Sequence, residues 1–126
     1  MLQLILHLVG DYVTQTSWMA ANKNKASFPA FVHATVYSLP FLILNPSMIA
    51  FAIILGTHFF IDRFRLARYL IAFREKIFSK DFKYSDTTDC GFHKDTPAWL
   101  STWLFIIIDN TLHLTCNYLA LEFFPK

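Results

Sequence analysis

Seven histidine and aspartate residues lie inside the apolar stretches of this 126-residue sequence, where ionisable side chains are rare and costly. They are His7, Asp11, His33, His58, Asp62, Asp109 and His113. Imidazole nitrogens and carboxylate oxygens are the ligands that zinc, manganese and iron commonly take in proteins. The residue types therefore predict a metal centre within the apolar part of the protein, with all seven as candidate ligands.

Three pairs among these residues repeat one spacing, a histidine and an aspartate four positions apart. The pairs are His7 with Asp11, His58 with Asp62, and Asp109 with His113. Residues four apart share one face of a helix, so both side chains can reach the same point, and helical bundles build metal sites in this way. A hydrogen-bonded clip between helices explains any single pair. Three pairs together with His33 favour the metal centre.

The seven candidate ligands are enough for one ion with supporting residues around it, or for two ions bridged by an aspartate. We expect zinc, with manganese or iron as alternatives. Three carboxylates in an apolar environment would repel one another without a cation. In a hydrolytic centre, Asp11, Asp62 and Asp109 are the candidate catalytic residues, since one of them would bridge the ions or act as general base for a metal-bound water.

Five further polar residues lie beside the candidate ligands. Gln15 and Asn117 extend the polar helix faces and Asn110 follows Asp109, so we expect these three to hydrogen-bond ligands or neighbouring helices. Arg63 and Arg65 come directly after the third apolar stretch. They can bind an anionic lipid headgroup, or they can simply anchor the chain at the cytoplasmic face of a membrane.

The elements that must position these residues are four apolar segments, at about residues 2–21, 28–44, 47–66 and 97–120. Apolar residues make up 55% of the chain and charged residues 16%, compared with about 25% charged in soluble domains. The apolar runs are continuous and do not alternate, which favours helices over a barrel. We therefore predict an all-α protein, a polytopic four-helix membrane bundle forming one integral membrane domain over residues 1–126.

The basic residues predict the orientation of that bundle. All the lysines and arginines except Lys126 fall in two stretches, one at Lys23 and Lys25 and the other within residues 63–94. This placement is typical of cytoplasmic loops and not of nucleic-acid binding. We expect an inner-membrane protein with a cytoplasmic loop at 67–96 and both termini outside. The third helix should continue beyond Asp62 as an amphipathic extension on the membrane surface.

Four motifs of the sequence resemble a family of small bacterial and phage membrane proteins that is catalogued as a domain of unknown function. They are His7-Leu-Val-Gly-Asp11-Tyr-Val-Thr-Gln15, the segment around His33, His58-Phe-Phe-Ile-Asp62-Arg63 and Asp109-Asn110-Thr-Leu-His113. The resemblance covers nearly the whole chain and implies a membrane protein without an assigned activity. More loosely, the helices carrying histidine and aspartate look like those of proteins named membrane-bound metal-dependent hydrolases.

The residues together predict a membrane metal-dependent hydrolase that acts on a phosphate ester or another lipid-borne bond near the cytoplasmic leaflet. Two functions of other classes remain open on the sequence. One is a transporter or channel that moves metal ions or protons through the polar core. The other is a non-catalytic membrane protein that acts on a host protein and holds a structural metal. The expected partner is the lipid bilayer, and the sequence allows an oligomer.

Overall fold

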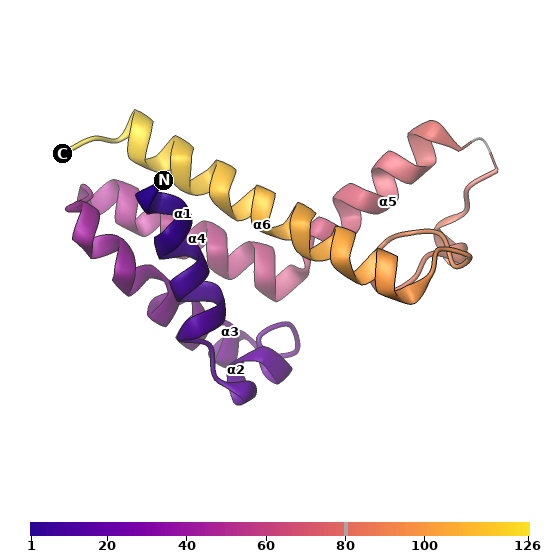
Figure 1. The fold of residues 1–126 in the computed structure, drawn as a ribbon, viewed down its shortest axis with the longest axis horizontal. Coiled ribbons are helices and arrows are strands. Elements are labelled where there is room, and N and C mark those ends of the chain that lie inside the picture. The colour runs from indigo at the N-terminus through magenta and orange to yellow at the C-terminus, as the bar shows by residue number, and fades with distance from the viewer. Residues whose placement is uncertain (80) are drawn as a thin grey trace. The chain divides into compact units, whose positions relative to one another are not determined.

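The computed structural model describes residues 1–79 and 81–126 (Figure 1). Lys80, part of the loop that we predict to be cytoplasmic, lies outside the described residues. The described residues are helical and form no strand beyond one isolated bridge between Thr87 and His93, which confirms the all-α class.

Contacts along the chain define two compact units, Met1–Phe64 with His113–Lys126, and Arg65–Leu112. We describe each unit by itself. The first unit consists of α1 (Leu2–Leu8), the π-helical turn η1 (Val9–Val13), α2 (Ser17–Asn22), α3 (Ser27–Ser38), the 3-10 helix η2 (Leu39–Leu44), α4 (Met48–Phe64) and the C-terminal part of α6 (Ala98–Phe123). Within it, α3 packs along α4, and η1 packs against α3 and η2.

The first predicted segment, residues 2–21, is not one continuous helix. α1 widens into the π-helical turn η1, in which the amide of Thr14 donates to the carbonyl of Val9. Thr16 then adopts an extended conformation, and its hydroxyl accepts a hydrogen bond from the amide of Met19 at the start of α2. This side-chain cap starts a new helix at Ser17, so residues 2–21 do not form one uninterrupted helix.

The second predicted segment forms one helical stretch, Ser27–Leu44, that changes from α to 3-10 at Leu39. Pro40 accounts for the change, because proline lacks an amide hydrogen and clashes with the preceding helical turn. Asn45 ends the stretch in the left-handed region with φ 51°. The hydroxyl of Ser47 then accepts a hydrogen bond from the amide of Ala50 and caps α4.

The third predicted segment does not continue into its basic extension as one helix. α4 ends at Phe64, and Arg65 takes the left-handed conformation with φ 50°. α5 (Leu66–Phe78) begins after it as a separate helix. The second unit therefore starts at this break and contains α5, the short 3-10 helix η3 (Tyr84–Asp86) and the N-terminal part of α6.

The described residues contain two helical stretches that are long and apolar enough to cross a membrane, Ser27–Leu44 and Ala98–Phe123. α4 has 17 residues, which is at the lower end of the roughly 17–25 residues that a span needs. The helical stretch Leu2–Val13 is shorter still. The structure thus supports two candidate spans by length and composition, fewer than the four that we predict from the sequence.

Candidate metal centre

The interior of the first unit is unusually polar. Its fully or almost fully buried polar side chains are His7, Asp11, His33, Ser38, His58, Asp62, His113 and Asn117. Small residues make room for them, since Ala30 and Ala34 on α3 and Ala50 on α4 are completely buried. The apolar core is modest and includes Leu6, Phe41 and Ile54. The fold therefore buries ionisable groups where a helical bundle ordinarily buries leucine and isoleucine.

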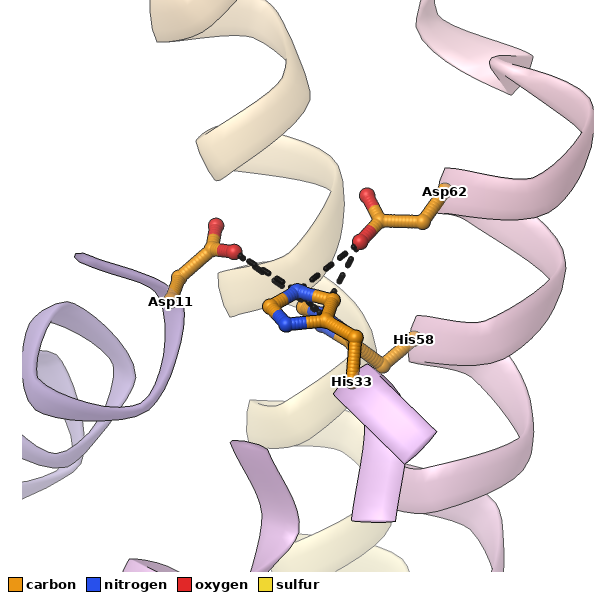
Figure 2. A group of neighbouring side chains, drawn as sticks. All are labelled: Asp11, His33, His58 and Asp62. Carbon is orange, nitrogen blue, oxygen red and sulfur yellow. Dashed lines mark hydrogen bonds and ion pairs between the residues drawn. The ribbon is translucent and has the colours of Figure 1, made fainter. Parts of the chain in front are cut away.

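Four of the predicted ligands converge on one point, as Figure 2 shows. Asp11 comes from η1, His33 from α3, and His58 and Asp62 from α4. The Nε2 atom of His33 lies 3.0 Å from Nε2 of His58, and 3.1 Å from both Asp11 Oδ1 and Asp62 Oδ2. The Nε2 atom of His58 lies 3.2 Å from Asp62 Oδ2 and 3.9 Å from Asp11 Oδ1. We call these four residues the His/Asp cluster.

Hydrogen bonds between the four residues do not account for this geometry. The two Nε2 atoms carry at most one hydrogen each, but they make four contacts of 3.0–3.2 Å within the cluster. Ligands at the corners of a tetrahedral zinc site, with bonds of about 2.0–2.1 Å, lie about 3.3 Å apart. The four short contacts are close to this spacing, the distance of 3.9 Å between Asp11 Oδ1 and His58 Nε2 is longer, and all four donor atoms lie within 4.8 Å of one another, so the cluster could hold a divalent cation.

Lys23 belongs to this site although the sequence did not single it out as a site residue. Its Nζ atom lies 2.8 Å from Asp62 Oδ2, 3.4 Å from Asp11 Oδ1 and 3.2 Å from His33 Nε2. The sequence places Lys23 in a basic loop, which signals only the orientation of a membrane protein. The turn after α2 folds back toward α4 and brings the ammonium to the carboxylates.

His113 contacts a different oxygen of the Asp62 carboxylate from the one that faces His33 and His58. Its Nε2 atom is 3.4 Å from Asp62 Oδ1, whereas Oδ2 of Asp62 faces His33 and His58. The rings of His58 and His113 have centroids 4.1 Å apart. Asp62 therefore links the His/Asp cluster to His113 through its two oxygens, which is the arrangement of a carboxylate that bridges two partners.

His7 takes part in a separate buried network around Tyr37. Its Nδ1 atom is 2.8 Å from the Tyr37 hydroxyl, which also accepts a hydrogen bond of 2.6 Å from the side-chain amide of Asn117. The π-helical turn η1, which contains Asp11, changes the regular four-residue spacing from His7, and the two side chains have different partners. Asn117 is thus a hydrogen-bonding residue of the core, with Tyr37 as its partner.

Five predicted site residues remain, and each is described on its own element. Asp109 and Asn110 are half-buried on α6 in the second unit, with Asp109 one helical turn before His113. Gln15 lies half-buried in the break between η1 and α2. The guanidinium of Arg63 donates to the carbonyl of Asn24 and to the hydroxyl of Ser27, and that of Arg65 lies over the ring of Phe105 within the second unit.

The fold and the site define a class of protein, an all-helical chain with a buried histidine and aspartate cluster that can hold a metal ion. A family of proteins of unknown function (DUF3307) matches residues 1–124, and the chain belongs to that family. Comparison with curated proteins and with solved structures finds no match.

Proposed function

We propose that this protein is a membrane protein that binds a divalent metal ion through Asp11, His33, His58 and Asp62 and uses it to hydrolyse a lipid-borne phosphate ester. The observation that carries the proposal is the convergence of two imidazole nitrogens and two carboxylate oxygens within 4.8 Å of one another, in a buried position. Zinc suits this donor set, with manganese or iron as alternatives.

The distribution of side chains on α3 and η2 supports the membrane location. The buried face carries four small or polar residues, Ala30, His33, Ala34 and Ser38, together with Tyr37 and Phe41, whereas several large apolar side chains are exposed. The exposed ones are Phe28, Phe31, Leu39, Leu42 and Ile43. Water would select the opposite arrangement, while helices in lipid bury small and polar residues and expose apolar ones.

The basic residues support an orientation with the His/Asp cluster near the cytoplasmic headgroups. The contact of Arg63 with the carbonyl of Asn24 joins the end of α4 to the loop that carries Lys23 and Lys25. The first basic stretch and Arg63, the first residue of the second stretch, therefore meet at one end of the first unit, as a positive-inside arrangement requires. The ammonium of Lys23 touches the cluster itself, so the cluster lies at this end and within reach of a lipid phosphate.

Charge supports an anionic substrate. A divalent ion would cancel the charges of Asp11 and Asp62 and leave the ammonium of Lys23 as excess positive charge beside the centre. A divalent cation activates water as a nucleophile and stabilises charge on a phosphoryl group. Asp62 and His113, joined by a contact of 3.4 Å, are placed to take up the proton that the attacking water loses.

Elemental analysis of the protein purified in detergent tests the metal centre. We expect about one divalent ion per chain in the wild type and in His93→Ala, because His93 is the histidine that lies outside the first unit. His58→Ala and Asp62→Asn should lose the ion. A wild type without stoichiometric metal would remove the basis of the proposal.

Release of inorganic phosphate from phosphatidate and from isoprenyl phosphates, incorporated in detergent micelles, tests the activity. We expect turnover by the metal-loaded wild type and by His93→Ala, with a loss of at least a hundredfold in Asp62→Asn. A protein that holds its metal and hydrolyses none of these substrates would contradict the hydrolase and favour a non-catalytic membrane protein with a structural metal.

A further inference from the structure

We propose that Lys23 is the residue that binds the anionic group of a ligand at the metal centre, and that the ligand is a phosphate monoester or inorganic phosphate. The inference rests on the proposed metal centre and assigns to Lys23 a role that the sequence suggested for Arg63 and Arg65. The guanidinium of Arg63 is already engaged with Asn24 and Ser27, and Arg65 belongs to the second unit.

Lys23 is the cation that the fold brings to the cluster. Of the described lysines and arginines, it forms the ion pairs with both Asp11 and Asp62. Its side chain is 19% exposed, compared with 5% for Asp11 and 4% for Asp62. Lys23 is thus the most exposed of the three side chains, and we take its side of the cluster, here called the entrance, as the side from which a ligand would arrive.

The backbone holds Lys23 at this entrance. Its amide donates to the carbonyl of Met19 in a 2.8 Å hydrogen bond that closes the last turn of α2. One residue later, the carbonyl of Asn24 accepts the hydrogen bond from Arg63 at the end of α4. Hydrogen bonds of the backbone at Lys23 and Asn24 thus fix the base of the side chain to α2 and to α4. These contacts keep the ammonium near the cluster.

Metal binding changes what the ammonium interacts with. In the absence of an ion, its positive charge compensates the carboxylates of Asp11 and Asp62, which repel each other in a buried site. A divalent ion among the four donors takes over that role and repels the ammonium. The flexible lysine stem allows the charge to move toward the entrance, where ammonium and metal ion together attract a phosphate, the anion that lysine commonly binds as a point charge.

Cobalt(II) loaded into the detergent-solubilised protein provides a test, because its visible absorption spectrum changes with its coordination. Inorganic phosphate and short-chain phosphatidate are titrated separately against the wild type, Lys23→Met, Lys23→Arg and Lys25→Met. Lys25 is the matched control, since it is an exposed lysine of the same loop. We expect a saturable spectral change in the wild type and Lys25→Met, an affinity lower by about tenfold or more in Lys23→Met, and a loss of only a few-fold in Lys23→Arg.

The two titrations distinguish the source of the phosphate. If phosphatidate binds more tightly than inorganic phosphate and both depend on Lys23, the ligand is a lipid. If the two bind equally, the ligand is free phosphate. Either result supports the role of Lys23. Equal phosphate affinity in Lys23→Met and the wild type overturns it. So does a Lys23→Met protein that binds no cobalt while Lys25→Met does, because Lys23 would then be part of the scaffold.

Cobalt content, measured before any phosphate is added, separates this inference from the proposed function. A wild type without stoichiometric cobalt contradicts the metal centre and the inference with it. A wild type with stoichiometric cobalt, whose spectrum neither phosphate compound changes, leaves the metal centre standing and overturns only the role of Lys23.

Discussion

The ring of Tyr37 lies almost parallel to the imidazole of His58, with ring centroids 3.5 Å apart and an angle of 13° between the planes. The same tyrosine directs its hydroxyl the other way, to His7 and Asn117. Tyr37 is completely buried and contacts both the His/Asp cluster and the second polar network, so its ring restricts the orientation of a proposed metal ligand. Its two functions, stacking and hydrogen bonding, can be tested separately.

Substitution Tyr37→Phe should lower the free energy of unfolding by about 1–3 kcal/mol, because two buried polar partners, His7 and Asn117, lose their shared hydroxyl. Metal content should stay at the wild-type level, since the aromatic ring still stacks on His58. Denaturant unfolding in detergent and elemental analysis measure the two quantities. Tyr118→Phe is the control, because Tyr118 is exposed on α6, and loss of metal from Tyr37→Phe alone would contradict the division of roles.

Gly10 allows η1 to approach α3 closely enough for Asp11 to reach the cluster. A Cβ atom at this position would lie 2.6 Å from the carbonyl oxygen of Tyr37 and 2.9 Å from its ring. Gly10→Ala should therefore push η1 away, cost about 1–3 kcal/mol of stability and weaken metal binding several-fold through Asp11. Thermal unfolding and metal titration provide the measurements.

Gly56 offers the matched comparison, because a Cβ atom there meets nothing within 4 Å. Since glycine in a helix interior is less stable than alanine by about 0.5–1 kcal/mol, Gly56→Ala should stabilise α4 and leave metal binding unchanged. Equal effects of the two substitutions would show that the close contact at Gly10 does not position Asp11.

Removal of the metal should destabilise the protein, because an ion that binds only the folded state adds stability according to its concentration and affinity. The gain is about 4 kcal/mol when the free ion is at 1,000 times its dissociation constant. We expect a chelator to lower the unfolding temperature of the wild type and of Asp95→Asn, whose side chain is exposed. Asp62→Asn should unfold at a lower temperature from the start and respond little to the chelator.

Arg65, at the break between α4 and α5, should tolerate substitution by glycine without a loss of stability. Arg65 has φ 50°, a left-handed conformation that costs a residue with a side chain about 1–2 kcal/mol. Arg65→Gly should therefore raise the free energy of unfolding or leave it unchanged. Arg74→Gly, within α5, should lower it by about 1 kcal/mol, the usual cost of glycine in a helix. A comparable loss in both variants would indicate a continuous helix through Arg65.

The pair His58 and Asp62 could be predicted from the sequence because its geometry is local. Four residues of regular helix place both side chains on one face of α4 whatever surrounds it, and the structure has Nε2 and Oδ2 3.2 Å apart. The helical class follows in the same way from the apolar pattern. The end of α4 at Phe64 does not, because the sequence predicts that this helix continues into the basic residues. The burial of both residues among helices also agrees with the expectation for ionisable groups in apolar segments.

The same spacing did not determine the partners of His7 and Asp11. Asp11 lies in a π-helical turn that begins after α1. The close approach of η1 to α3 at Gly10 accompanies the contact of Asp11 with His33, while His7 contacts Tyr37. The role of Lys23 had no local signal, since its neighbours in the sequence mark only a basic loop. The sequence determines short-range geometry, because regular helix fixes where residues four apart lie. The tertiary structure decides the rest, because the packing of separate helices brings together Asp11, Lys23, His33 and the α4 pair.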